Sequence, residues 1–237
     1  MSKIYFFRHA QASFGADNYD ELSPKGEQQS VELGNYLVGK KINFDKAYIG
    51  PLKRQQHTFE IVKSIFDKNN LPMPEPILEN GLLEHNGHKA MAKLMPTLQK
   101  SFPFVQELIE KSKANPARKR ANNLLAFQYF LNEWVEGKIE AEGVLPWKEF
   151  RQKVKKGLET ILKETGSGET IAAFTSGGTI SSITAEALNL TDEKRVVALN
   201  FSHRNTAFTS FFYSRGQFNL LGFNEIPHLS EEMITFI

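Results

Sequence analysis

The sequence has no cysteine, which excludes disulfide bridges, thiolate metal sites and a cysteine nucleophile. It also has no apolar run near the roughly 20 residues that a membrane-spanning helix needs. No charged segment followed by a long apolar stretch opens it, as a secretory signal would. The formal net charge is only +2, too small to indicate binding to nucleic acid or to a membrane surface. We therefore expect a cytoplasmic protein with neither kind of partner.

The 237 residues suit one large α/β domain, and the order of elements in the first half supports this. The apolar run 4–7 predicts a strand buried on both faces. Ser23 followed by Pro24 predicts a helix start, with the helix running to about residue 38. A short strand at 46–49 and a helix over 52–69 follow. This alternation predicts a parallel sheet covered by helices.

Residues 89–145 differ from their flanks, because they carry helical patterns and no clear strand. We interpret them as a helical insertion that covers one side of a pocket. Its basic cluster is better explained as a solvated helix surface than as a binding patch; the cluster consists of Lys111, Lys113, Arg118, Lys119 and Arg120.

The remaining segments complete a single domain over 1–237. They predict a helix over 147–164, a buried strand at 170–174, and a helix to residue 188 that Thr179 or Ser181 caps. Two further strands, 207–213 and 218–221, are expected to be antiparallel near an edge. The predicted fold is an α/β three-layer sandwich: a mostly parallel central sheet with helices on both faces, plus the helical insertion.

Two buried strands end in polar segments that are suited to an anion. Arg8 and His9 follow the first strand, and ligands of open α/β sheets bind beyond the carboxyl ends of the strands. Arginine offers a fork of donors for phosphate oxygens, and histidine offers a nucleophilic nitrogen near neutral pH. The second strand leads through Ser176 into Gly177 and Gly178, where a helix N-terminus and a close backbone approach favour an anion.

These segments, taken in order, resemble the histidine phosphatase superfamily, the phosphoglycerate mutase-like group. The resemblance extends over nearly the whole chain and is weakest in the helical insertion. Five motifs and one closing segment carry it: Arg8-His9-Ala10, Leu22-Ser23-Pro24-Lys25-Gly26, Pro51-Leu52-Lys53-Arg54, Leu83-Glu84, Gly177-Gly178 and Asn205-Thr206-Ala207-Phe208.

The resemblance implies a role for each matching residue. His9 would be the nucleophile that becomes phosphohistidine, and Arg8 and Arg54 would hold the phosphoryl oxygens. Glu84 would protonate the leaving oxygen and then activate water. Ser176 and Gly177 would also contact phosphate. Phosphoryl transfer independently calls for such charge stabilisation and an in-line nucleophile. The resemblance implies no metal and no cofactor.

One position departs from the family pattern. The second catalytic histidine of the family belongs immediately before the glycine pair, where this sequence has Ser176. Loss of one such transition-state contact typically costs about 10²–10³ in rate. His203 is a candidate to compensate, and His85 and His88 flank Glu84 closely enough to line the pocket.

Three functions therefore compete. The first is a cofactor-independent phosphomonoester hydrolase that uses His9, with a phosphoglycerate-type mutase as a less favoured variant. The second is a family member that binds phosphorylated ligands or a protein partner without efficient turnover, which Ser176 favours. The third, a serine hydrolase using Ser176, requires Gly-x-Ser-x-Gly, but position 174 is Phe.

The expected ligand is a small phosphomonoester or inorganic phosphate. Specificity is expected to come from the insertion and from loop 11–22, and a basic cluster facing the pocket would favour a substrate with more than one phosphate. A homodimer is one oligomeric state compatible with the sequence.

Overall fold

The computed structural model describes residues 1–13 and 20–236, apart from the side chain of Arg120. Within this part a six-stranded sheet has the order β3-β2-β4-β1-β5-β6. The strands are β1 (Ser2–Arg8), β2 (Lys46–Ile49), β3 (Pro76–Leu78), β4 (Thr170–Thr175), β5 (Phe208–Ser214) and β6 (Gln217–Glu225). β1, β2, β3 and β4 run parallel to one another, whereas β5 runs antiparallel to both β1 and β6. The predicted mostly parallel sheet with an antiparallel edge is confirmed.

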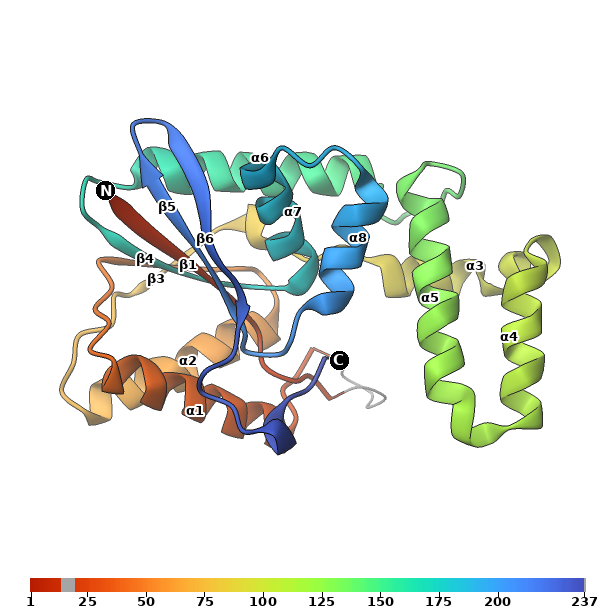
Figure 1. Ribbon diagram of the computed structural model, residues 1–237, viewed down its shortest axis with the longest axis horizontal. Coiled ribbons are helices and arrows are strands. Elements are labelled where there is room, and N and C mark those ends of the chain that lie inside the picture. The colour runs from red at the N-terminus through yellow and green to blue at the C-terminus, as the bar shows by residue number, and fades with distance from the viewer. Residues whose placement is uncertain (14–19, 237) are drawn as a thin grey trace.

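Eight α-helices belong to the described part of the chain (Figure 1). They are α1 (Pro24–Gly39), α2 (Lys53–Lys68), α3 (Gly87–Ser101), α4 (Pro103–Ala114), α5 (Lys119–Val135), α6 (Trp147–Glu164), α7 (Gly177–Leu188) and α8 (Glu193–Ser202). Three short 3₁₀ helices complete the set: η1 (Asn80–Leu82), η2 (Pro116–Arg118) and η3 (Glu231–Met233). None of these helices is long and apolar enough to cross a membrane.

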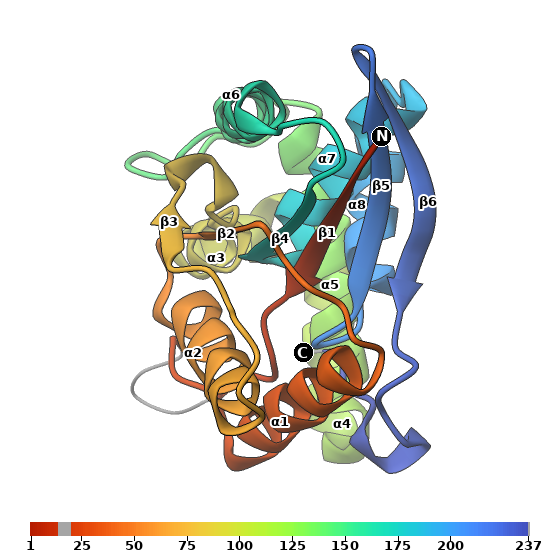
Figure 2. The same ribbon diagram turned by 90° about the vertical axis from the view of Figure 1, so that its left-hand side faces the viewer.

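Successive residues of β1 supply two separate cores, because side chains of a strand alternate between the faces of the sheet. Tyr5 and Phe7 pack with α1 and α2, and Phe7 stacks on Phe174 with ring centroids 4.8 Å apart. Ile4 and Phe6 face the opposite core, to which α6 and α7 contribute. Figure 2 shows helices on both sides of the sheet. The three-layer arrangement thus follows from a strand that is apolar on both faces.

The predicted start of α1 is confirmed, and that of α7 is wrong. Ser23 caps α1 by accepting a hydrogen bond from the Gly26 N–H, with Pro24 at the first helical position. In α7, Ser176 rather than Thr179 or Ser181 is the N-cap residue, and its side chain makes no cap bond. The two residues predicted as caps use their hydroxyl groups as donors instead. Thr179 Oγ1 donates to the Leu83 carbonyl, and Ser181 Oγ donates to the Gly177 carbonyl.

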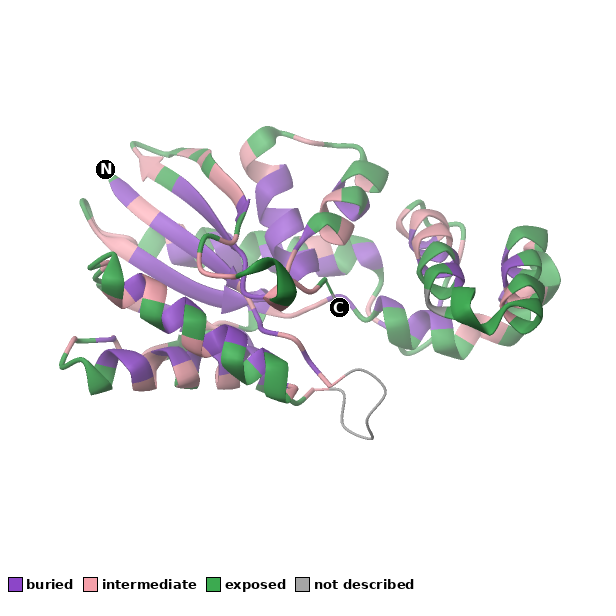
Figure 3. Cartoon of the chain, turned by 60° about the horizontal axis from the view of Figure 1, so that its bottom comes forward, coloured by how far each residue is buried: buried purple, intermediate pink, exposed green. Residues whose placement is uncertain are grey.

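Helices α3, α4 and α5 lie between Glu84 and α6 in sequence and extend away from the sheet (Figures 1 and 3). The described members of the basic cluster, Lys111, Lys113, Arg118 and Lys119, are exposed at the turn between α4 and α5. Figure 1 shows this turn at the end of the molecule far from the carboxyl end of β1. The structure therefore favours a solvated surface over a cluster that faces the pocket.

Candidate active site

The predicted site residues lie together at one end of the sheet, where the parallel strands β1, β2 and β4 reach their carboxyl ends. Arg8 and Thr175 are register partners at the ends of β1 and β4, and the His9 N–H donates to the Thr175 carbonyl at 2.8 Å. Beyond β2, the segment from Gly50 leads directly into α2, which carries Arg54 in its first turn. Parallel strands thereby gather residues from three distant parts of the chain.

His9 is buried and held in a single tautomer. Its Nδ1 lies 2.7 Å from the Ala10 carbonyl oxygen, which can only accept, so Nδ1 must carry the proton. Nε2 therefore carries the lone pair, which accepts a hydrogen bond from the Arg54 Nε–H at 3.0 Å. Burial, followed by the charges of Arg54 and Arg8, holds the pKa of His9 well below its usual value. The ring is thus a neutral imidazole whose Nε2 is nucleophilic.

The end of the chain supports the backbone of His9. The Asn205 side-chain amide donates to the His9 carbonyl at 3.2 Å, and the Thr206 N–H approaches the same oxygen at 3.4 Å. Thr206 has a φ of +57°, a left-handed conformation that is rare for a β-branched residue. Thr206 Oγ1 also contacts His228 Nε2 at 2.9 Å. The Asn-Thr segment therefore fixes the backbone that carries the His9 ring.

Arg54 joins His9 to the N-terminus of α2. Besides its bond to His9, its Nη1 donates to Asp20 Oδ1 at 2.7 Å. The other carboxylate oxygen of Asp20 accepts from the Lys53 N–H at 2.9 Å. One carboxylate thus orients the guanidinium and also satisfies a donor of the helix N-terminus.

Arg8 lies on the other side of the site, where its Nη1 donates to the His203 carbonyl at 2.5 Å. A Cβ added to Gly177 would lie 3.5 Å from Arg8 Nε and 2.7 Å from Asn200 Oδ1. Glycine at position 177 therefore leaves the N-terminus of α7 open beside Arg8.

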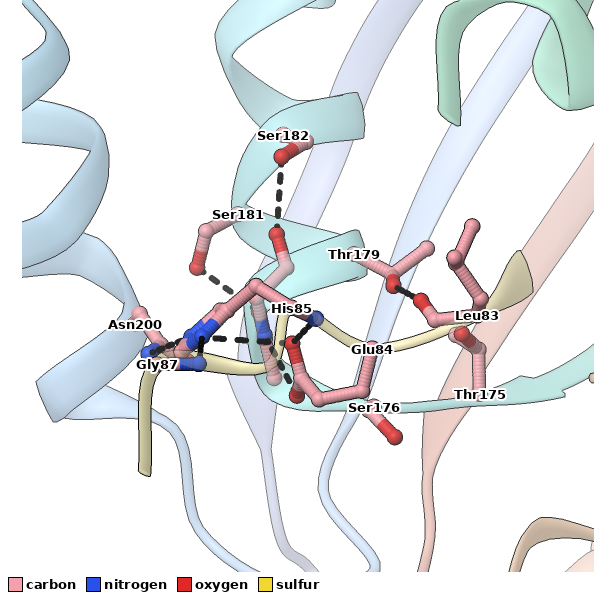
Figure 4. Close-up of polar contacts among 12 residues, drawn as sticks. Leu83, Glu84, His85, Gly87, Thr175, Ser176, Thr179, Ser181, Ser182 and Asn200 are labelled. Atoms are coloured by element: carbon pink, nitrogen blue, oxygen red, sulfur yellow. Dashed lines mark hydrogen bonds and ion pairs between the residues drawn. The ribbon is translucent and has the colours of Figure 1, made fainter. Parts of the chain in front are cut away.

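Glu84 sits at the same helix N-terminus. Its Oε1 accepts from the backbone N–H of His85 at 2.7 Å, and its Oε2 accepts from the Gly178 N–H at 3.2 Å (Figure 4). A Cβ on Gly178 would overlap both the Glu84 carboxylate and the His85 ring. The second glycine is thus required by the approach of the Glu84 side chain.

Ser176 is fully buried and bonded to a side chain that sequence patterns did not single out. Its Oγ accepts from Gln55 Nε2 at 2.8 Å, and the same Nε2 donates to the Leu82 carbonyl at 3.0 Å. Gln55 Oε1 accepts from the Leu52 N–H at 3.0 Å. In Figure 4 the Ser176 hydroxyl points away from the Glu84 carboxylate. Gln55 therefore occupies the space beside position 176.

The other histidines lie around this centre. His203 is buried beside Phe223, with ring centroids 5.0 Å apart, and its ring nitrogens have no hydrogen-bond partner within the described chain. Burial, then the charge of Arg8, lowers the pKa of His203 to about 3. The His88 ring stacks on Phe127 at 3.9 Å, and burial lowers its pKa to about 4. Both rings are therefore neutral at neutral pH.

The structure thus brings together Arg8, His9, Arg54, Glu84 and Gly177, whereas the Ser176 side chain faces Gln55. Sequence patterns missed Asp20, Gln55 and Asn200. These are single polar residues in a loop or on helices, and no spacing marks them as neighbours of the site. Within residues 1–13 and 20–236, no three His, Asp or Glu side chains are grouped closely enough to hold a metal ion. Half of loop 11–22, residues 14–19, lies outside the described residues.

The fold and this arrangement agree with a comparison against known families. The sequence model of the histidine phosphatase superfamily (branch 1) matches residues 4–136 and 125–226, and the chain belongs to this superfamily.

Curated relatives include both mutases and phosphatases. A 2,3-bisphosphoglycerate-dependent phosphoglycerate mutase from Hamiltonella defensa is 28% identical over 79 residues, which are 31% of this chain and 32% of that protein. A 2-carboxy-D-arabinitol-1-phosphatase from Triticum aestivum is 30% identical over 111 residues, 42% of this chain and 22% of that protein. The matched part thus spans about a third or less of these relatives.

Solved structures of the same fold cover nearly all of the chain. A phosphoserine phosphatase from Entamoeba histolytica in complex with 3-phosphoglyceric acid is 19% identical, with a TM-score of 0.62 over 97% of this chain and 100% of that one. A phosphoglycerate mutase from Bacillus anthracis is 16% identical, with a TM-score of 0.64 over 96% of this chain and 94% of that one. At these identities the likeness is one of fold.

Proposed function

We propose that this protein is a phosphomonoester hydrolase that acts through a phosphohistidine on His9. The observation that carries the proposal is the fixed tautomer of His9: Nδ1–H is tied to the Ala10 carbonyl, so the lone pair of Nε2 points toward Arg54. A neutral, buried imidazole held between two arginines is suited to attack a phosphoryl group. The phosphatases among its relatives and structural neighbours support this reaction class.

The reaction proceeds in two steps, formation of the phosphohistidine and its hydrolysis. His9 Nε2 attacks phosphorus, the ester P–O bond breaks, and the protonated Glu84 carboxyl gives its proton to the leaving alkoxide. Glu84, now a carboxylate, takes a proton from water, whose oxygen attacks the phosphohistidine. The P–N bond then breaks and releases inorganic phosphate and neutral His9. Arg8, Arg54 and the N-terminus of α7 stabilise the charge on the equatorial oxygens.

The substrate we propose is a small phosphomonoester. One structural neighbour, the phosphoserine phosphatase, is in complex with 3-phosphoglyceric acid. A substrate of this size is in keeping with a site at the carboxyl ends of the strands. The same chemistry with an alcohol in place of water would make the enzyme a mutase, in line with the phosphoglycerate mutases among its relatives.

A second candidate function is phosphate binding without efficient turnover. The contact between Ser176 and Gln55 favours it, because the Ser176 side chain is engaged away from Glu84. Arg8, Arg54 and the helix N-terminus would still bind a phosphorylated ligand.

Turnover of p-nitrophenyl phosphate and a panel of sugar phosphates decides between the two functions. We expect measurable turnover in the wild type, a loss of at least about 10³-fold in His9→Ala, and an acid-labile phosphoenzyme in the wild type only. His57→Ala, which alters a histidine on the same helix as Arg54, is the matched control and should retain full activity. If calorimetry shows that the wild type binds phosphate, and neither the wild type nor the variants show turnover, the second function is established instead.

A further inference from the structure

The ring of His85 lies against the Glu84 carboxylate in a buried position that the mechanism above does not use. Its Nε2 is 3.6 Å from Glu84 Oε1 and 3.1 Å from the Asn200 side-chain amide (Figure 4). Asn200 belongs to α8, and its side chain also borders Gly177. Residues from three elements therefore meet around the carboxyl group that is to transfer the proton.

The proton of the His85 ring has one possible position. The Gly87 backbone N–H, which can only donate, lies 3.1 Å from Nδ1 and makes that nitrogen an acceptor. Burial lowers the pKa of His85, so the ring is neutral and its single proton is on Nε2. The atom at 3.1 Å from Nε2 is Asn200 Nδ2, and two donors cannot meet there, so the amide must turn to let Oδ1 accept from Nε2–H. The Nε2–H is thus directed between Asn200 and Glu84.

Aromatic side chains prevent the ring from turning. Trp147 and Phe150 of α6 each lie 5.7 Å from the His85 ring centroid, and Trp134 of α5 lies 6.2 Å from it. His85 itself is 7% exposed. A histidine packed in this way has a fixed direction for its N–H, as a positioning group requires.

We propose that His85 is a positioning residue for Glu84: its Nε2–H, together with Asn200, fixes the carboxyl group at the N-terminus of α7 for proton transfer to the leaving group. The inference rests on the proposed function. The backbone N–H groups of His85 and Gly178 hold the two carboxylate oxygens, and the His85 ring closes the side from which Glu84 could rotate away. Removing the ring leaves the backbone contacts but frees the side chain.

The leaving group of the substrate provides the test. p-Nitrophenolate departs without a proton, whereas an alkoxide requires one, so loss of general-acid positioning affects the first step only for alkyl phosphates. This step is reported by kcat/KM, because the hydrolysis of the phosphohistidine that follows is common to both substrates. For His85→Ala we expect kcat/KM on an alkyl phosphate to fall about 10²-fold, and kcat/KM on p-nitrophenyl phosphate to fall less than about threefold. His85→Gln, which retains an N–H donor, should recover part of the loss. Glu84→Gln should show the same selectivity in kcat/KM, and His57→Gln none.

An equal loss of kcat/KM on both substrates would overturn the proposal, because it would place His85 in phosphate binding or in the fold. NMR of the imidazole nitrogens tests the same contact without turnover. We expect the proton on Nε2 of His85 and a shift of that resonance in Glu84→Gln. A proton on Nδ1, or a resonance indifferent to Glu84→Gln, would refute the positioning role. If the wild type hydrolyses neither ester, the proposed function fails while the NMR result still decides the contact.

Discussion

Arg54 contacts both the proposed nucleophile and the acidic residue that orients it, and each contact uses a different part of the guanidinium. Nε faces His9, and Nη1 faces Asp20. The rigid fork of arginine makes this division possible, whereas the ammonium group of lysine is a single point on a flexible stem. The direction of the positive charge, and not only its presence, is therefore set by the side-chain type.

We expect Arg54→Lys to retain phosphate binding but to lower kcat about 10²–10³-fold, the cost of one transition-state contact. Steady-state kinetics with p-nitrophenyl phosphate would measure this, with Lys53→Ala, one residue earlier and exposed, as the matched control. A kcat within tenfold of the wild type would show that charge alone suffices at this position.

At the scale of the elements, the contact between Gln55 and Ser176 ties the start of α2 to the junction between β4 and α7. Gln55 also bonds the Leu82 carbonyl, so three segments that meet only in the folded state share one buried amide. Neither residue has any exposure. A larger side chain at position 176 would meet Gln55 before it could reach the phosphate site.

For this reason Ser176→His alone should not create or improve phosphatase activity. We expect overpacking and a lost buried hydrogen bond to lower the free energy of unfolding by about 1–3 kcal/mol. Ser176→His combined with Gln55→Ala removes the overpacking but also the Gln55 bonds to Leu52 and Leu82, so it should recover only part of this stability, as measured by urea unfolding. A stable, more active single variant would show that the Gln55 side chain moves aside readily.

The turns that carry the site were predictable, and their polar neighbours were not. An apolar strand that runs into Arg8 and His9 has a physical signature, as does the Ser23-Pro24 helix start, and both predictions hold. Strand β3 was missed because Pro76 opens a three-residue strand at the sheet edge, the position where proline is tolerated. Gln55 and Asn200 were missed because their role depends on three-dimensional contacts between segments.

At the scale of the whole molecule, the histidines make folding sensitive to acid. The pKa values of His9, His85, His88, His203 and His228 are all lowered, primarily by burial, with those of His88 and His228 at about 4. Between these values and the usual pKa near 6.5, the unfolded chain binds more protons than the folded one. Stability therefore rises with pH through this window and is lost as the pH falls below about 6.5.

We expect the free energy of unfolding to fall between pH 6.5 and 4 by up to roughly 1.4 kcal/mol per pH unit for each of the buried rings of His9, His85 and His203, and by less for the exposed His88 and the half-buried His228. Urea unfolding at a series of pH values would measure the slope. His228→Asn should reduce it, because asparagine does not titrate. A free energy of unfolding that is constant from pH 7 to pH 5 would contradict the assigned neutral state of these rings.

The position of β1 has a consequence for how the protein is made. β1 is synthesised long before its two sheet neighbours, β4 and β5, which begin at Thr170 and Phe208. Pairing across such sequence separations closes long loops and is slow. The segment that ends in His9 must therefore wait, unpaired and apolar, until most of the chain has left the ribosome. His9 is translated before these two strands and reaches its working position only after them, so a nascent chain that stops before β5 has no complete site.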